Sequence, residues 1–196
     1  MPEFLVGKRL RVVGKGGTVG GGESSGRVTV VVAPGAFGSG EHETTASCLE
    51  ALEEIPGLIG SHVLDLGSGT GILAIAALGL AAERAVCVDV DERAVATARH
   101  NCELNGVAGR VTHVHGTLAD VGSSGFDVAL ANLHGELLVT LAESLVAAVR
   151  PGGYLVLSGI LWEDDFTVRQ RYEVLGCSLE SHRFLEEYAT LVFRRP

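Results

Sequence analysis

Cysteine is scarce in this sequence and shows no metal-binding or redox spacing. The four cysteines lie far apart, and no two of them are spaced as C-x-x-C; they are Cys48, Cys87, Cys102 and Cys177. A disulfide-rich secreted domain or a zinc ribbon would need a denser and more regular spacing. Each cysteine lies in an apolar or helical pattern, so we expect reduced thiols with mostly structural roles.

Long hydrophobic runs are also missing. No apolar stretch reaches the roughly 18 residues that suggest a membrane span. Residues 1–13 lack the apolar segment of a secretory signal. We therefore expect a soluble, cytoplasmic protein that does not contact the membrane.

Positive charge is under-represented. Lys and Arg number 15 against 24 Asp and Glu, which gives a formal net charge of -9. Proteins that bind nucleic acid normally carry a basic patch that neutralises phosphates, so we expect no direct nucleic-acid partner. An acidic surface instead suits a cationic ligand or a basic protein partner.

Strand and helix patterns alternate along most of the 196 residues. A glycine- and serine-rich run at residues 14–26 separates two strand-like stretches, which predicts a flexible hairpin loop or the remnant of a connection. We therefore expect an N-terminal β hairpin or linker at residues 1–33 and one domain at residues 34–196. From about residue 62, near-continuous apolar strands alternate with helices, which predicts a parallel sheet covered on both faces. The last two strands, joined by a short polar turn, predict an antiparallel hairpin at one side of the sheet.

The fold class that these patterns predict is α/β, with a doubly wound, mostly parallel sheet of seven strands. Several helix ends carry local signals. Apolar residues recur at helical spacing from Glu43 to Ile55, and Pro56-Gly57 should end that helix. Asp91 is the expected N-cap of another helix, and Asn105-Gly106 its expected end. Residues 151–153, Pro-Gly-Gly, should end a later helix.

The stretch "VLDLGSGTGILAIAALG", residues 63–79, is typical of a buried strand that enters a glycine loop and then a helix. Ligands of doubly wound sheets bind at the carboxyl ends of the strands, so this loop is the predicted nucleotide site. Gly67, Gly69 and Gly71 follow the spacing G-x-G-x-G, whereas a dinucleotide loop follows G-x-G-x-x-G. Because glycine has no Cβ, the backbone can approach a ligand closely.

Two carboxylates flank the glycine loop. Asp65 precedes Gly67 by two residues, where its charge would repel a pyrophosphate but attract a cationic ligand. S-adenosylmethionine carries an ammonium and a sulfonium and no phosphate. Asp89 ends the next predicted strand. Its separation from the glycine loop is close to the roughly 20 residues at which an acid accepts hydrogen bonds from ribose hydroxyls. Asp89 suits either nucleotide, but Asp65 and the glycine spacing favour S-adenosylmethionine; a tight turn without ligand, with Asp65 as a loop cap, is the alternative.

In order and spacing, several segments resemble the ribosomal protein methyltransferases of the PrmA family. They are "VLDLGSGTGILAIAAL", "VDVDERAV", "NCELNGV", "FDVALANL" and "RPGGYLVLSGIL", and upstream "PGAFGSGEHETTASCLEAL" resembles the family signature P-G-x-A-F-G-T-G-x-H-x-T-T. The resemblance covers roughly residues 28–195. It implies a Rossmann-like class I enzyme that uses S-adenosylmethionine to methylate amino groups, lysine among them, of the eleventh protein of the large ribosomal subunit. The implied partner is a basic protein such as a ribosomal protein.

Matching motifs imply that Thr45, Gly67, Asp89 and Asn132 contact the cofactor. Thr45 would offer its hydroxyl and helix N-terminal N–H groups to a carboxylate, with Thr44 as a plain N-cap in the alternative. Asn132 ends a strand at the same crevice and is the predicted catalytic residue, because its carbonyl would orient a substrate amine; termination of the strand alone is the alternative. The predicted cofactor-binding residues are Thr45, Asp65, Gly67, Gly69, Gly71, Asp89 and Asn132.

The sequence departs from the family pattern in two places. The signature "PGAFGSG" is one residue short, and only about 27 residues precede the core, where the family carries a separate domain that binds the ribosomal protein. Either the chain is truncated or its substrate differs. An NAD-linked oxidoreductase, which the loop spacing disfavours, and a cofactor-binding remnant without turnover are the alternative functions.

Four further features have roles that the sequence leaves open. His113 and His115 share one face of a predicted strand but lack two further ligands for zinc, so we expect no metal site. His42 could help close the cofactor site, and His134 could approach the substrate or be a surface-loop residue. Trp162, the one tryptophan, is either a packing anchor or part of the acceptor pocket.

Overall fold

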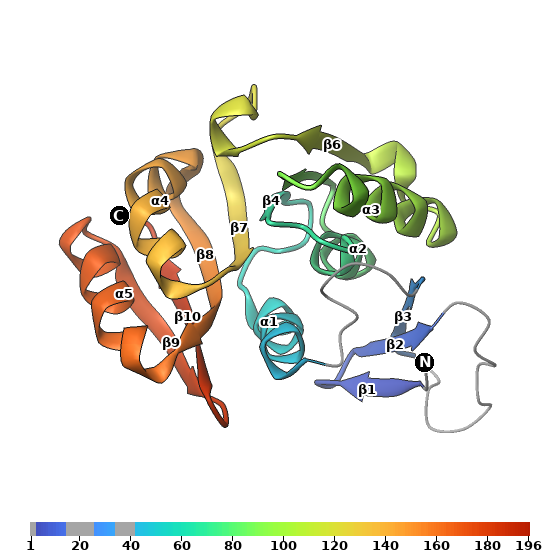
Figure 1. Cartoon of the computed structure of the whole chain (residues 1–196). Coiled ribbons are helices and arrows are strands. Elements are labelled where there is room, and N and C mark those ends of the chain that lie inside the picture. The colour runs from blue at the N-terminus through green and yellow to red at the C-terminus, as the bar shows by residue number, and fades with distance from the viewer. Residues whose placement is uncertain (1–2, 15–25, 34–41) are drawn as a thin grey trace.

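The structure, a computed structural model, describes residues 3–14, 26–33 and 42–196 (Figure 1). These residues form a seven-stranded sheet of order β6-β5-β4-β7-β8-β10-β9. Its strands are β4 (His62–Leu66), β5 (Arg84–Asp89), β6 (Val111–His115), β7 (Phe126–Asn132), β8 (Val149–Leu161), β9 (Ser178–Phe184) and β10 (Tyr188–Arg194). Strands β4 to β8 are parallel, and β10 is antiparallel to both β8 and β9. The predicted doubly wound, mostly parallel sheet with a C-terminal hairpin is confirmed.

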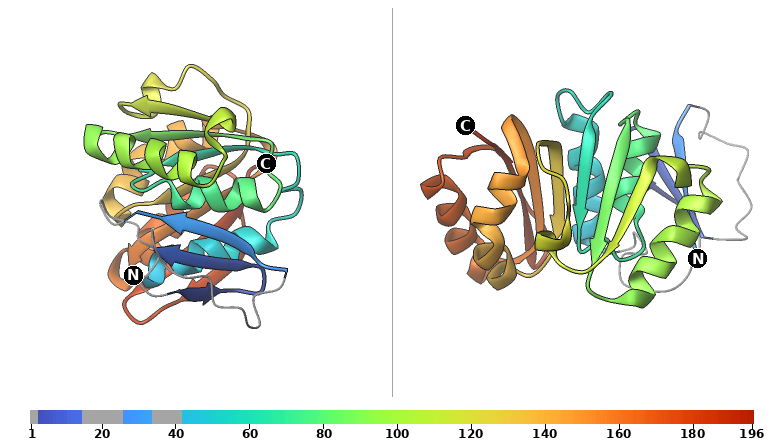
Figure 2. Two further views of the ribbon diagram at one scale, coloured as in Figure 1. Left: turned by 90° about the vertical axis from the view of Figure 1, so that its right-hand side faces the viewer. Right: turned by 90° about the horizontal axis from the view of Figure 1, so that it is seen from above.

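Helices cover both faces of this sheet. They are α1 (Glu43–Glu54), α2 (Ile72–Gly79), α3 (Glu92–Leu104), α4 (Gly135–Ala148) and α5 (Trp162–Val174), with the 3-10 turns η1 (Ala108–Arg110) and η2 (Leu118–Asp120). Successive strand residues pack on opposite faces: Val63 belongs to the cluster of α1 and α2, and Leu64 to the cluster of α4 and α5. Figures 1 and 2 show α4 and α5 on the side away from α1 and α2.

Most of the predicted helix ends are confirmed. Asp91 caps α3 by accepting a hydrogen bond from the Arg93 N–H, and Asn105 is the C-cap. The N-cap of α1 is His42, whose ring nitrogen accepts from the Thr44 N–H, so Thr44 is not the cap. Helix α4 ends at Ala148 rather than at residues 151–153, because the chain already joins the sheet at Val149, beside β7.

A second, three-stranded sheet precedes α1 and corrects one prediction. It consists of β1 (Phe4–Val6), β2 (Leu10–Gly14) and β3 (Val28–Val32), in that spatial order. β1 and β2 are antiparallel, but β2 and β3 are parallel, so the hairpin predicted between the latter two is wrong. A parallel pair needs a connection of about a dozen residues, and the glycine-rich segment is long enough to supply one. Residues 15–25 of that segment lie outside the described residues.

The small sheet packs on the outer side of α1 and α2, as Figure 1 shows. Its apolar side chains share one buried cluster with these helices; they are Val6, Leu10, Val12, Val30 and Val32. The contact with α2 is close, since a Cβ on Gly79 would lie 2.4 Å from Cγ1 of Val28. The small sheet is therefore part of the same packed body. A domain boundary at residue 34 stays a prediction.

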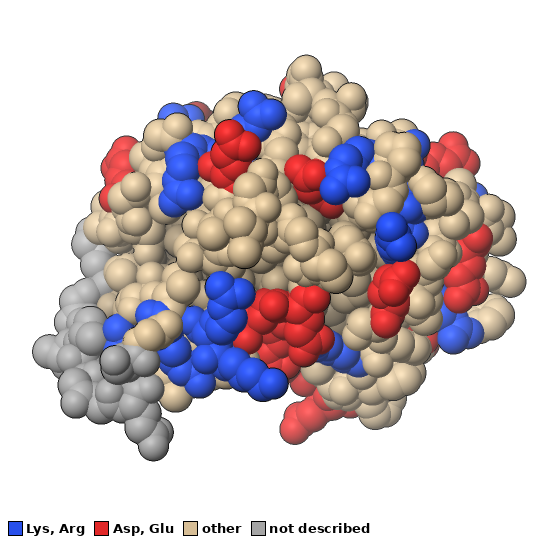
Figure 3. Space-filling model, turned by 180° about the vertical axis from the view of Figure 1, so that it is seen from behind, with Lys and Arg blue, Asp and Glu red and all other residues tan. Residues whose placement is uncertain are grey.

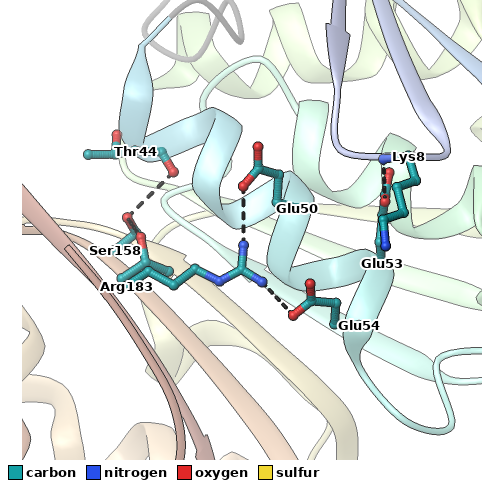
Figure 4. Close-up of polar contacts among 8 residues, drawn as sticks. Lys8, Thr44, Glu50, Glu53, Glu54, Ser158 and Arg183 are labelled. Carbon is teal, nitrogen blue, oxygen red and sulfur yellow. Dashed lines mark hydrogen bonds and ion pairs between the residues drawn. The ribbon is translucent and has the colours of Figure 1, made fainter. Parts of the chain in front are cut away.

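Polar contacts join α1 to the turn between β1 and β2 and to strand β9 (Figure 4). The carboxylate of Glu53 accepts hydrogen bonds from the backbone N–H groups of Lys8 and Arg9, each at 2.8 Å, in the turn between β1 and β2. On the same helix, Glu50 and Glu54 pair with Arg183 of β9. Figure 3 shows acidic and basic side chains adjoining on this face of the molecule.

Replacing Glu53 with alanine is expected to lower the free energy of unfolding by about 1 kcal/mol, because two backbone donors lose a charged acceptor at a water-accessible position. Glu103→Ala, at an exposed position of α3, is the matched control, with an expected change below about 0.5 kcal/mol. Urea unfolding measures both values. Equal values for the two variants would show that Glu53 does not anchor the turn.

Candidate functional site

A cavity of about 670 Å³ opens at the carboxyl ends of β4, β5 and β7. This volume falls within the range of about 300 to 1,000 Å³ typical of small-molecule pockets. Five of the seven predicted site residues line it: Thr45, Gly67, Gly69, Asp89 and Asn132. Residues from separate parts of the chain thus meet in one cavity. No helix in the described part of the chain is long and apolar enough to span a bilayer.

The glycine loop is held against the end of β5. The N–H groups of Gly67 and Ser68 donate to the Val88 carbonyl at 2.8 and 3.0 Å. Gly67 and Gly69 have φ values of 71° and 52°, a left-handed conformation that favours glycine. A Cβ on Gly67 would also lie 2.5 Å from Cδ2 of Leu133. The loop therefore presents bare backbone to the cavity.

Asp89 links the glycine loop to the start of α3. Its Oδ2 accepts from the Gly69 N–H at 2.9 Å, and its Oδ1 accepts from the Asp91 N–H at 3.0 Å. A carboxylate has about four acceptor positions, so two remain for hydroxyl groups of a ligand. The position of Asp89 on the cavity wall agrees with the predicted contact to a ribose.

Asp65 and Gly71 do not line the cavity. Asp65 is 1% exposed, and its Oδ2 accepts from the Ala74 N–H at 3.1 Å in the first turn of α2. Gly71 has a φ of 77°, and a Cβ there would lie 3.1 Å from Cβ of Ala98 on α3. Both residues support the loop from beneath. The direct cofactor contact predicted for them stays a prediction.

Burial raises the pKa of Asp65 to about 7; the Ala74 N–H opposes the shift, and the Asp89 charge adds to it. A carboxyl whose pKa is higher in the folded state than in the unfolded state destabilises the protein once it ionises. Its stability contribution therefore falls as the pH rises from about 4 to about 7. We expect the stability of Asp65→Asn, relative to the unsubstituted protein, to increase over this range. Denaturant titrations at about pH 5 and about pH 8 measure the difference, and a constant difference would contradict the assignment.

Asn132 and Thr45 are in contact on the cavity wall. Nδ2 of Asn132 donates to Oγ1 of Thr45 at 3.3 Å, so the amide oxygen is the end left to accept from a ligand. The N–H groups expected to receive a carboxylate are already used. The Thr45 N–H donates to the His42 carbonyl at 3.0 Å, and the Thr44 N–H donates to the His42 ring. Thr45 therefore has its hydroxyl, rather than its N–H, available for a ligand.

A β-bulge at the end of β8 shapes the wall beside Asn132. Ile160 pairs with Ala189 and Leu157 with Leu191, so two residues of β8 oppose one residue of β10. One of the two is Gly159, with a φ of 77°, and a Cβ there would lie 3.0 Å from Oδ1 of Asn132. Bulges often occur next to active sites, where they redirect the chain. The sequence analysis did not identify Gly159 as a site residue, although a glycine inside a strand is a recognised signal of a bulge.

The other bulged residue, Ser158, is fully buried behind the cavity wall. Its hydroxyl bonds to Oγ1 of Thr190 at 2.7 Å and donates to the Thr44 carbonyl at 3.4 Å, the contact drawn in Figure 4. Three elements, α1, β8 and β10, are thereby joined directly behind Thr45 and Asn132. The network thus holds Thr44, the chain neighbour of Thr45, and Ser158, the strand partner of Asn132.

The remaining walls come mostly from residues that the sequence analysis did not single out, with His42 and His134 among the exceptions. Apolar side chains form much of the surface: Val90, Leu118, Leu137 and Leu141. Tyr188 also lines the cavity, and its ring packs edge-on against His42, with 5.3 Å between ring centroids. His134 lies on the wall as the N-cap of α4, where Nδ1 accepts from the Leu137 N–H at 3.3 Å. Trp162 is neither in the wall nor buried; it is 55% exposed, and its Nε1 donates to the Tyr188 carbonyl.

The model of the family described as ribosomal protein L11 methyltransferase (PrmA) matches residues 4–196. The chain belongs to the PrmA family. It is 41% identical to the ribosomal protein L11 methyltransferase of Trichlorobacter lovleyi over 98% of its own length and 64% of that relative. It is 45% identical to the protein of the same name from Geobacter metallireducens, over 86% of its length and 55% of that relative. The chain thus spans less than two thirds of these PrmA relatives.

Solved structures agree on the fold. The crystal structure of ribosomal protein L11 methylase from Lactobacillus delbrueckii subsp. bulgaricus matches with a TM-score of 0.90 at 24% identity, over 100% of this chain and 98% of that one. An RNA methyltransferase from Salinibacter ruber, in complex with S-adenosyl-L-homocysteine, matches with a TM-score of 0.61 at 22% identity, over 76% of this chain and 91% of that one. Likeness at this level of identity concerns the fold alone.

Proposed function

We propose that this chain binds S-adenosylmethionine and transfers its methyl group to an amino group, most simply a lysine, of ribosomal protein L11. The observation that supports this most strongly is the placement of Asp89 and the Asn132–Thr45 pair on the walls of one cavity, with the glycine loop also in its wall. Family membership supports the same activity. The seven site residues predicted from the sequence remain part of the proposal, with Asp65 and Gly71 acting through the loop.

The residues that line the cavity fit S-adenosylmethionine better than a dinucleotide. Gly67 and Gly69 bring bare backbone to the cavity wall, and Asp89 retains acceptors for ribose hydroxyls. Val90 and Leu118 offer apolar surface to an adenine. The lining residues within the described ranges include Asp89 and Asp91 but no Lys or Arg. A pyrophosphate would meet repulsion there, whereas an ammonium and a sulfonium would be attracted.

S-adenosylmethionine supplies a methyl group on a cationic sulfur, which is an activated leaving group. The protein must then hold a neutral amine in line with that methyl group, and such positioning supplies much of the rate. Because Nδ2 of Asn132 already donates to Thr45, its Oδ1 can accept an N–H of the amine and direct the lone pair. Gly159 leaves space beside that oxygen. Positive charge on the bound cofactor lowers the pKa of a nearby lysine, which favours the neutral amine.

Calorimetric titration with S-adenosylhomocysteine and with NAD, in parallel, tests the cofactor. We expect S-adenosylhomocysteine to bind more tightly; tighter binding of NAD would favour an oxidoreductase and overturn the proposal. Label transfer from S-adenosylmethionine to purified ribosomal protein L11 tests the acceptor. Cofactor binding without label on any lysine-rich protein would indicate a remnant without turnover, and label on a different acceptor would correct the substrate.

A further inference from the structure

Exposed aromatic side chains lie on α5 and at the end of β9, two elements in contact, and one of them adjoins the cavity wall. Trp162, Phe166 and Phe184 are 55%, 60% and 62% exposed. The Trp162 ring nitrogen donates to the Tyr188 carbonyl at 3.2 Å, and Tyr188 lines the cavity. Phe166 lies one turn further along α5. Large exposed aromatic groups close together are unusual on a soluble protein and commonly mark a binding surface.

Acidic residues lie in the same segments of the chain as these aromatic groups. Glu163 and Asp164 lie in the first turn of α5, and Glu186 and Glu187 lie in the turn between β9 and β10. Within the described ranges, none of these four carboxylates forms an ion pair. The backbone places the two groups together, since the Trp162 N–H donates to the Glu187 carbonyl at 3.2 Å.

The arginines closest in sequence do not neutralise this surface. Arg183 pairs with Glu50 and Glu54 on α1. Arg169 is 4.0 Å from Glu173, and its guanidinium lies 5.8 Å from the centre of the Phe166 ring. Residues 159–168 and 184–193 contain no Lys or Arg. The surface therefore combines aromatic rings with four carboxylates that form no ion pair among the described residues, and Arg169 is the cation that adjoins it, over the Phe166 ring.

We propose that this acidic aromatic rim, made of Trp162, Glu163, Asp164, Phe166, Phe184, Glu186 and Glu187, docks a basic segment of the acceptor protein next to the amine that is methylated. The proposal rests on the proposed function, because it assigns the acceptor side of the same cavity. Aromatic faces attract lysine and arginine and cover their aliphatic stems. Carboxylates around the mouth raise the local concentration of a cationic segment. A second copy of this chain, with a net charge of -9, would be repelled.

The test compares a rim charge reversal with a matched reversal elsewhere. Glu163→Lys/Glu187→Lys changes the rim, and Glu83→Lys/Glu103→Lys makes the same charge change at exposed positions outside it. Phe166→Ala removes one exposed ring and leaves the Trp162 hydrogen bond in place. The probe is purified ribosomal protein L11, titrated against each variant loaded with S-adenosylhomocysteine, at low and at moderate salt.

We expect the rim reversal to weaken L11 binding by about tenfold or more and to make that binding less dependent on salt. Charges at the edge of an interface mainly change the association rate and its dependence on salt. Phe166→Ala should weaken it by about tenfold, and the control by less than about twofold. S-adenosylhomocysteine affinity should be unchanged throughout. Equal L11 affinities for rim and control variants, or no L11 binding to the unsubstituted chain, would overturn the proposal that the rim docks the acceptor. A Phe166→Ala effect on self-association alone would assign the surface to a second copy.

These outcomes separate the two proposals. If the unsubstituted chain methylates L11 and the rim variants do so with the same kcat/KM and Kd, the proposed function is supported and the role of the rim is contradicted. If L11 binds and the rim variants weaken that binding although no methyl group is transferred, the rim holds and the proposed function fails.

Discussion

Replacing Asn132 with alanine is expected to lower kcat for methyl transfer by about 100-fold, with little change in affinity for S-adenosylhomocysteine. The loss follows from geometry: a misdirected amine costs roughly that factor in a reaction that depends on positioning. The Asn132 amide is fixed by Thr45 on one side and faces Gly159 on the other, so its oxygen has a defined direction. Single-turnover rates and calorimetric titration measure the two quantities separately.

Thr45→Val is the companion variant. It removes the acceptor of the Asn132 amide N–H while keeping the size of the side chain, so kcat should fall by about tenfold, less than for Asn132→Ala. If Asn132→Ala instead weakened cofactor binding and left kcat intact, Asn132 would be a cofactor ligand only. If neither quantity changed, Asn132 would merely end strand β7.

Asp89→Ala is expected to weaken S-adenosylhomocysteine binding by about 1 to 3 kcal/mol, or roughly 5- to 150-fold. Two effects add: ligand hydroxyls lose a charged acceptor, and the Gly69 and Asp91 N–H groups lose the carboxylate that orders the loop. Calorimetric titration gives the affinity, and urea unfolding gives the accompanying loss of stability.

Asp127→Ala is the matched control for Asp89→Ala. Asp127 also accepts a backbone N–H, that of His62 at 2.7 Å, and it also binds Arg150, but it lies at the start of β7 and outside the cavity wall. Its loss should lower stability by a similar amount and leave the affinity unchanged. Equal losses of affinity in the two variants would mean that Asp89 acts only through general stability.

The large sheet could be predicted because its information is local. Most parallel strands contain a short apolar run, and the helices between them carry signals such as the Asp91 cap and the Asn105 end, which the structure confirms. The predicted C-terminal hairpin follows from two strands joined by a short polar turn. Such features depend on a few neighbouring residues, so they survive in any fold of this class.

The small sheet could not be predicted in the same way. β2 and β3 are each recognisable as strands, but whether they pair parallel or antiparallel depends on the path of the connection and on the surface of α1 and α2 beneath them. A glycine-rich connection is equally compatible with an antiparallel hairpin and with a longer crossover between parallel strands. The outcome is decided by tertiary packing rather than by local preference.

The site shows the same division. Gly67, Gly69 and Asp89 belong to a local motif and lie on the cavity wall, as predicted. Asp65 belongs to the same motif but faces α2, since residues along a strand alternate between the two faces of the sheet, and the sequence alone did not assign those faces to the cavity. Gly159 and Tyr188 reach the wall through the pairing of β8 with β7 and with β10, which brings distant segments together. Sequence motifs therefore predicted the residues of the glycine loop better than the wall residues contributed by β8 and β10.

Mass spectrometry of ribosomal protein L11 after incubation with this chain and S-adenosylmethionine tests the central claim most directly. We expect the mass of L11 to increase by one or more methyl groups on an amino group, and we expect no such increase with the Asn132→Ala variant. An unmodified L11, under conditions in which S-adenosylhomocysteine binding is saturated, would contradict it.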